Sequence, residues 1–240
     1  MQRISLAVLF AALQCCIASW DTLFFDDFNG SASGAWSITN ENPGLYSYTP
    51  TYLDLLCSAG TLSAGYNNAE NLFLITNPTL GDFTATMRVL SFSPPQSFQQ
   101  IDVLALDDVD NYVRAVYGRI GEPSLEFGAE TGGAWASSIS PFDPGASAFY
   151  MRLTKVGNVY SQFISTDGTS WSQANETLAY GDGTPSYIGF VASDTWNIAA
   201  PADVQIDWFR VEGDVVPEPG AAALMLGALA ALATRRKRRC

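Results

Sequence analysis

Two glutamates near the middle of the chain have a spacing that can serve glycoside hydrolysis. Glu126 and Glu130 stand four residues apart in the run Glu-Phe-Gly-Ala-Glu. Enzymes that cleave glycosidic bonds use two carboxyl groups that flank the bond. Side chains four residues apart share one face of a strand only if the strand is unbroken, and Gly128 weakens it. We therefore expect an exposed strand with solvated charges.

Other kinds of catalysis lack their residues. The 240-residue chain contains no histidine, which excludes Ser-His-Asp and Cys-His catalysis and ordinary zinc sites. Apart from three cysteines at the chain ends, Cys57 is alone, so we expect no intramolecular disulfide and a buried, unreactive thiol. The sequence predicts that the protein is not an enzyme.

Hard oxygen ligands gather at two places where calcium (Ca2+) is the expected metal. The segment from Asp107 to Asn111 lacks the glycine and the distal glutamate of an EF-hand loop. We favour the alternative of a turn whose side chains bond their own backbone. At the second place, Asp26 or Asp27 meets Asp207 if the first and last strands pair. Asp207 accepting backbone hydrogen bonds is the alternative to a calcium site at Asp27 and Asp207.

Aromatic side chains in polar loops are candidates for stacking on sugar rings. Trp135 and Trp196 lie in such loops, and Tyr48 lies in a tyrosine-rich one. For each of them the alternative is a ring folded back onto the core. Three other tryptophans are expected in the core, namely Trp36, Trp171, which directly follows the Asp167-Gly168 turn, and Trp208.

The elements that position these residues are short strands. Apolar residues alternate with polar ones over runs such as 83–89, 112–117 and 149–154, and Gly, Pro, Asn and Asp separate the runs. The Gly157-Asn158 pair predicts a tight hairpin between two runs. The pattern indicates an all-β, antiparallel two-sheet jelly-roll sandwich with no helix longer than about two turns.

The middle of the chain resembles the concanavalin A-like (laminin G, lectin and glucanase) jelly rolls of secreted bacterial proteins. The resemblance covers roughly residues 22–213 and rests on Phe24–Phe28, Asn111–Arg114, Met151–Tyr160, Phe163–Trp171, Tyr187–Val191 and Ile206–Val211. It implies the fold, whereas the function stays open because such jelly rolls include sugar binders, glycosidases and adhesion modules. The jelly-roll glucanases carry a Glu-x-Asp-x-x-Glu motif, which this chain lacks.

Both chain ends have the composition of targeting signals. Residues 1–18 combine a basic start with an apolar run and a small residue at the end, which predicts a signal peptide. At the other end Pro217-Glu218-Pro219 precedes a short apolar helix at 221–234 and a basic tail at 235–240 that includes Arg235 and Arg236. A run of this length reaches only about 20 Å, short of a hydrocarbon core of roughly 30 Å.

This C-terminal order of parts resembles the PEP-CTERM sorting signal of exported bacterial proteins. The resemblance implies an exosortase-type membrane protease as partner and delivery to the cell surface or extracellular matrix. It also implies transient anchoring in the inner membrane through a transmembrane helix. An ordinary tail anchor is the alternative. The expected domains are the signal peptide, a jelly roll at 19–213, a linker at 214–220, the hydrophobic helix and the cytoplasmic tail.

The exported body is strongly acidic. All 24 acidic residues lie between Asp21 and Glu218, and only six basic residues remain once the terminal signals are removed, which gives a formal net charge of −18. Such a surface repels nucleic acid and anionic lipid head groups. We expect a non-catalytic surface or matrix protein that binds carbohydrate, with extracellular polysaccharide as a partner. A divergent glycoside hydrolase of the concanavalin A-like class is the alternative.

Overall fold

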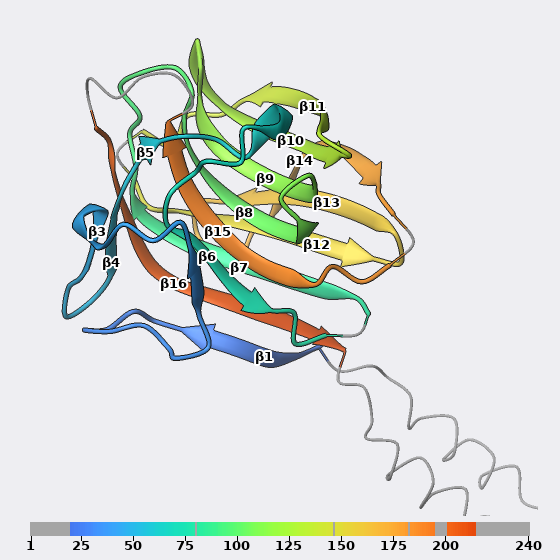
Figure 1. Ribbon diagram of the computed structural model, residues 1–240, viewed down its shortest axis with the longest axis horizontal. Coiled ribbons are helices and arrows are strands. Elements are labelled where there is room, and N and C mark those ends of the chain that lie inside the picture. Colours follow the sequence, from blue (N-terminus) through green and yellow to red (C-terminus); the bar gives the residue numbers. More distant parts are fainter. Residues whose placement is uncertain (1–19, 80, 146, 182, 195–200, 215–240) are drawn as a thin grey trace, which may run out of the picture.

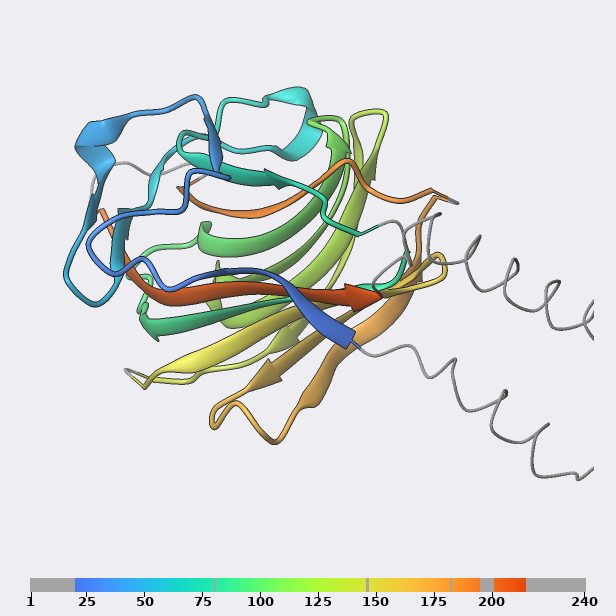
Figure 2. The ribbon, with the colours of Figure 1, turned by 90° about the horizontal axis from the view of Figure 1, so that it is seen from below.

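The computed structural model describes residues 20–79, 81–145, 147–181, 183–194 and 201–214. These residues form two β-sheets packed face to face (Figures 1 and 2). The helical elements among them are two 3-10 turns of three residues, η2 (Pro43–Leu45) and η3 (Ser63–Gly65). No helix in these ranges is long and apolar enough to cross a membrane. The predicted all-β sandwich is confirmed, whereas the two terminal signals lie outside the described residues.

Sheet A has the strand order β14-β13-β12-β7-β16-β4-β3, and β1 pairs with β16. All of its pairings are antiparallel. Its strands are β1 (Trp20–Asp26), β3 (Tyr46–Tyr48), β4 (Leu53–Leu56), β7 (Phe83–Ser91), β12 (Phe149–Val156), β13 (Val159–Ser165), β14 (Ser172–Ala179) and β16 (Asp203–Asp214).

Sheet B has the strand order β11-β10-β9-β8-β15-β6-β2, and β5 adds a short parallel pairing to β15. Its strands are β2 (Ser37–Thr39), β5 (Ser58–Ala59), β6 (Leu72–Thr76), β8 (Gln99–Asp108), β9 (Asn111–Ile120), β10 (Glu122–Thr131), β11 (Ala134–Pro141) and β15 (Tyr187–Asp194).

Turn chemistry and the pairing of the chain ends follow the sequence pattern. The two-residue turn between β12 and β13 has Gly157 at φ 60°, a conformation that glycine adopts without steric cost. The first and last strands pair as expected, with Asp26 opposite Phe209. Strand β16 lies inside sheet A, between β7 and β4, and β1 pairs with it. The first and last strands of the described fold therefore lie next to each other.

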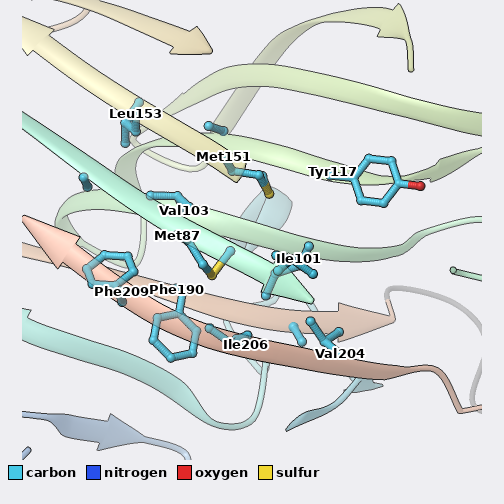
Figure 3. Packing of buried hydrophobic residues seen from close by; sticks show 14 of the residues in the cluster. Met87, Ile101, Val103, Tyr117, Met151, Leu153, Phe190, Val204, Ile206 and Phe209 are labelled. Atoms are coloured by element: carbon cyan, nitrogen blue, oxygen red, sulfur yellow. The ribbon is translucent and has the colours of Figure 1, made fainter. Parts of the chain in front are cut away.

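The main core lies between the sheets and is formed by one side chain in two from each long strand. Figure 3 shows this packing, in which Met87, Met151 and Phe209 of sheet A approach Val103 and Phe190 of sheet B. Cys57 is buried, as predicted, and its thiol points at the backbone oxygen of Gln100 at 3.6 Å. Trp36 packs against this core, where it stacks on Phe28 and meets Phe190 edge to face, which confirms its expected place.

Trp171 and Trp208 correct the sequence-based prediction, because neither belongs to the core. Trp208 follows a register shift in β16 between Ile206 and Trp208, which turns its ring to the outer face of sheet A. Trp171 lies just after the turn that ends β13 and packs against Tyr150 on the same outer face. Both side chains are half-buried.

Candidate functional site

The outer face of sheet B carries an ionic cluster built from three neighbouring strands. The cross-strand register aligns Asp102 of β8 with Val116 of β9 and Glu126 of β10. The next row contains Leu104, Arg114 and Gly128. Arg114 therefore projects from the middle strand, one row away from two carboxylates on the strands that flank it.

Arg114 connects the two carboxylates. Its Nη1 lies 3.1 Å from Asp102 Oδ2, and its Nη2 lies 3.9 Å from Glu126 Oε2. The guanidinium also donates to Ser63 Oγ at 2.9 Å and lies 4.3 Å from the centre of the Trp135 ring. With 3% of its surface exposed, Arg114 depends on these contacts to compensate for the loss of water.

The prediction of an exposed strand with solvated charges at Glu126 and Glu130 is wrong. Strand β10 runs unbroken from Glu122 to Thr131, and its two inner glutamates are 8% and 0% exposed. Gly128 does not interrupt the strand, and its missing side chain leaves space for the indole of Trp135. A methyl group at this position would lie 2.7 Å from Trp135 Cζ2, so only glycine lets the indole lie across β10 between the two glutamates.

Each glutamate is held by specific donors. Glu126 Oε1 accepts from Trp135 Nε1 at 3.2 Å and from Ser137 Oγ at 2.5 Å. Glu130 Oε2 accepts from the Tyr112 hydroxyl at 2.9 Å. The hydrogen bonds fix both carboxylates at defined positions on the sheet face.

Asp102 is the most perturbed carboxyl group of the cluster. It is 0% exposed, and burial raises its pKa from 3.8 to about 7, although Arg114 opposes the shift. Gln100 Nε2 donates to its Oδ2 at 3.0 Å, whereas its Oδ1 has no hydrogen-bond partner. At neutral pH this group is therefore present in both its protonated and its ionised form.

A segment of residues 60–71, here called the cover segment, shields the cluster from solvent. Leu62 and Ala69 of this segment pack against Leu104, Leu106, Tyr112 and Val191 of sheet B in a second, smaller apolar cluster with Trp135 at its edge. Figure 2 shows η3, in cyan, beside the green strands of sheet B. Asn67 Nδ2 ties the segment to Asp110 Oδ1 at 2.7 Å. Ser63 of the segment accepts from Arg114 Nη2 at 2.9 Å, so the segment contacts the ionic cluster directly.

The predicted sugar-stacking residues are dispersed. Trp135 lies on β11 rather than in a loop, within the ionic cluster. Tyr48 lies on β3, packs against Tyr46 and the main core, and has its phenol pKa raised to about 12 by burial, with smaller contributions from Asp26 and Glu41. Trp196 lies outside the described residues, as do the sorting-signal residues Pro217, Glu218, Pro219, Arg235 and Arg236.

The residues predicted to bind calcium have protein partners. Asp207 forms an ion pair with Arg88, and Asp27 Oδ2 accepts from Asn29 Nδ2 at 2.7 Å. Asp26 accepts from Ser33 N and Trp36 Nε1 at 2.7 and 2.6 Å. No group of three or more His, Cys, Asp or Glu side chains in the described part of the chain is arranged to hold a metal ion. A calcium site at Asp27 and Asp207 stays a prediction.

The acidic segment from Asp107 to Asn111 forms the turn that was the favoured alternative. Asp108 Oδ1 accepts from the backbone of Asp110 and the side chain of Asn111, both at 2.9 Å. Asp107 Oδ1 accepts from the backbone of Ser186 at 3.1 Å. The oxygens of this turn are thus directed to its own backbone and to a neighbouring loop.

No protein-family model matches this chain, and a search of curated proteins finds no match. Solved structures do match. A GH43 protein, BlXynB from Bacillus licheniformis, superposes with a TM-score of 0.69 at 18% identity over 80% of this chain and 40% of its own. The chain shares its fold with glycoside hydrolases. A xylan β-1,4-xylosidase from Bacillus halodurans gives 0.61 at 16% identity over 79% of this chain and 39% of its own.

A second kind of relative has the fold along almost its whole length. The β-glucanase of Bacillus licheniformis superposes with a TM-score of 0.57 at 15% identity over 80% of this chain and 98% of its own. The chain thus spans about two fifths of the GH43 proteins but nearly all of the glucanase. These matches overturn the prediction that the protein is not an enzyme, because several solved structures that share its fold are glycoside hydrolases.

Sequence reasoning missed Asp102 and Arg114. Each is a lone charged residue between apolar neighbours in a predicted strand, Ile101 and Val103 for the first, Val113 and Ala115 for the second. Opposite charges on the exposed sides of two successive strands are a signal for a cross-strand ion pair. The register that brings Glu126 to the same arginine is long-range information that the pattern does not contain.

Proposed function

We propose that the protein is an exported, carbohydrate-active jelly roll that acts as a divergent glycoside hydrolase of the concanavalin A-like class. The observation that carries this proposal is the buried Asp102–Arg114–Glu126 cluster on the outer face of sheet B. The shared fold supports the reaction class. A solvent-excluded pair of carboxyl groups bridged by an arginine supplies groups suited to that reaction.

Asp102 is the candidate general acid. Burial holds its pKa near 7, so a large fraction of the group carries a proton at neutral pH and can protonate a leaving glycosidic oxygen. Glu126 is the candidate base. Trp135 Nε1 and Ser137 Oγ donate to its Oε1, and Arg114 lies beside its Oε2. These contacts hold the carboxylate in place, and an ionised carboxylate can activate water.

The two carboxylates stand on strands separated by β9, so their backbones are about 10 Å apart. The guanidinium of Arg114 lies between them and contacts both. Inverting enzymes separate their carboxyl groups by about 6.5–9.5 Å, whereas retaining enzymes separate them by about 5–5.5 Å. Both kinds of mechanism use one group as acid and the other as base or nucleophile.

The chemical test is turnover of β-linked glucan and xylan by the exported body and its variants. Asp102→Asn and Glu126→Gln should each lower kcat by about 10²–10⁴-fold. Glu122→Gln is the matched control, because Glu122 lies on the same strand but is exposed. Circular dichroism and melting temperature verify that each variant is folded. Absence of turnover by the wild type, or equal loss in all three variants, contradicts the proposal.

Export is part of the same proposal and rests on the sequence signals at both ends. Pro217-Glu218-Pro219, the apolar run and the basic tail support processing by an exosortase-type protease near this motif. Intact mass of the surface-released protein tests it. The mature form should begin near Ser19 and end near the motif, whereas a mass that retains Arg235 to Cys240 would indicate a simple tail anchor.

A further inference from the structure

The outer face of sheet A carries a continuous row of aromatic rings. Phe25 of β1 lies 6.2 Å from Trp208 of β16, which lies 6.0 Å from Tyr150 of β12. Tyr150 in turn lies 6.3 Å from Trp171, measured between ring centres. Phe25 is 49% exposed and the other three rings are half-buried. Strands β1, β16 and β12 belong to sheet A, in which β7 lies between β16 and β12, and Trp171 lies in the loop between β13 and β14 (Figure 1).

Three arginines are interleaved with these rings. Arg88 is opposite both Trp208 and Tyr150 in the strand register, and Arg210 is opposite Phe25. Arg152 stacks on a ring most closely, with its guanidinium carbon 3.6 Å from the centre of Trp171. The rings and these three arginines are called the arginine–aromatic face below. Half of the six basic residues of the body therefore lie on one sheet surface of a molecule with a net charge of −18.

The arginines retain donor capacity. Arg88 pairs with Asp207, and Arg210 Nη2 lies 3.3 Å from Glu212. In the described residues Arg152 meets no carboxylate within ion-pair distance, and its Nε donates to Thr86 Oγ1 at 3.2 Å. Each guanidinium thus uses one nitrogen for a protein partner, whereas its fork can donate up to five hydrogen bonds.

Arg152 is the arginine of this face best placed to bind an anion. The other two arginines are paired with carboxylates, whereas Arg152 meets none within ion-pair distance in the described residues, and burial lowers its pKa although the nearby Glu212 opposes the shift. Stacking on Trp171 occupies the face of the guanidinium, and the edge of such a plane is the part that binds a carboxylate through two hydrogen bonds. The neighbouring ring faces suit the apolar faces of sugar rings.

We propose that the arginine–aromatic face binds an acidic polysaccharide whose sugars carry carboxylate groups. The arginines bind the carboxylates, and Trp171, Tyr150, Trp208 and Phe25 stack on the sugar rings between them. This site lies on sheet A, on the opposite side of the sandwich from Asp102. It extends the proposed function, because it holds a chain-like ligand independently of any hydrolysis on sheet B.

The test is calorimetric titration of the exported body with oligogalacturonate, and with a neutral xylo-oligosaccharide of equal length. The wild type should bind the acidic oligosaccharide, and Arg152→Gln should weaken its Kd by about tenfold, the loss of one charge-assisted contact. Arg152→Lys should recover part of the affinity, because lysine retains the charge without the fork. Arg119→Gln is the matched control, since Arg119 lies on β9 of sheet B.

The outcomes separate this site from the one on sheet B. Binding that depends on Arg152 but survives Asp102→Asn supports the inference, even if no glycan is hydrolysed. Equal weakening in Arg152→Gln and Arg119→Gln overturns it, because it indicates a general charge effect. Equal affinity for the neutral oligosaccharide, or displacement by acetate at the same carboxylate concentration, also overturns it. The melting temperature of each variant confirms that the fold is retained.

Discussion

Replacement of Arg114 by methionine should destabilise the protein more at alkaline than at acidic pH. Arg114 is 3% exposed, contacts Asp102 and Glu126, and stacks on Trp135. Methionine fills most of the buried aliphatic volume but removes the charge. Loss of one partner from a buried ion pair costs about 3–5 kcal/mol, because the other group must stay buried either as an unpaired charge or with a proton that it would release in water, so we expect a loss of that size at pH 8.

The pH dependence comes from Asp102. Burial raises its pKa in the folded state to about 7, against 3.8 for the ordinary group. Below pH 3.8 Asp102 is protonated in both the folded and the unfolded protein, and its full contribution to stability is present. As the pH rises from 3.8 to about 7, the unfolded protein loses this proton before the folded protein does, so the free energy of unfolding falls. The loss is on the order of 4 kcal/mol, at about 1.36 kcal/mol per pKa unit.

Without Arg114 this loss extends to higher pH. Arg114 lowers the pKa of Asp102, so the methionine variant should keep Asp102 protonated beyond pH 7 and lose stability over a wider range. At pH 5 Asp102 is neutral in both proteins. The cost there is reduced to the lost ring stacking, the Ser63 hydrogen bond and the contact with Glu126, about 1–3 kcal/mol in all.

Urea unfolding at pH 5, 6, 7 and 8 measures these differences, with a shared m-value confirming that the denatured states are comparable. The double variant Arg114→Met, Asp102→Asn is the control, since it removes the buried charge together with its partner. Its free energy of unfolding should recover much of the loss at pH 8 and vary less with pH. Parallel curves for wild type and Arg114→Met across this range would refute the reasoning.

Three further predictions concern the same face of sheet B. Leu62→Ala should lower the free energy of unfolding by about 2 kcal/mol and speed hydrogen exchange in the cover segment, since Leu62 of this segment is 2% exposed against sheet B. Gly128→Ala should cost about 1–3 kcal/mol and change the fluorescence of Trp135, because the added methyl would overlap the backbone oxygen of Ala136 and lie 2.7 Å from the indole. Nuclear magnetic resonance of fresh hydrolysis products should show a single anomeric configuration, as two fixed carboxylates require, and a mixture of both anomers would exclude the assigned pair.

The sheet architecture was predictable because strand periodicity is a local property. Alternation over runs such as 149–154, and a two-residue turn at Gly157-Asn158, determine which side chains face the core and where a hairpin closes. The pairing of β1 with β16 was expected from the resemblance to concanavalin A-like domains. The confirmed placement of Cys57 follows from the same logic, since it continues the alternation of β4 into the core.

The sheet B site was not predictable from that pattern, because β8, β9 and β10 are buried on both faces. In β8 every residue from Gln99 to Leu106 is buried. The alternation of side chains shows which residues share a face of the strand, but it does not indicate that both faces are excluded from solvent. Glu126 was taken for a solvated charge for this reason. Its contacts with Trp135, Ser137 and Arg114 arise from the pairing of β10 with β11 and β9, and a short window of sequence does not contain that register.

The two outer faces illustrate how burial determines what the same residue types can do. Arg114 over Trp135 and Arg152 over Trp171 are both arginine–tryptophan stacks. The first lies beneath the cover segment, where its charge must be neutralised by Asp102 and Glu126 within the protein. The second lies on the outer face of sheet A, where water or a ligand can accept hydrogen bonds from the remaining N–H groups of the guanidinium. An arginine that already has buried carboxylate partners can orient them for chemistry, whereas one without such a partner remains available to an acidic ligand.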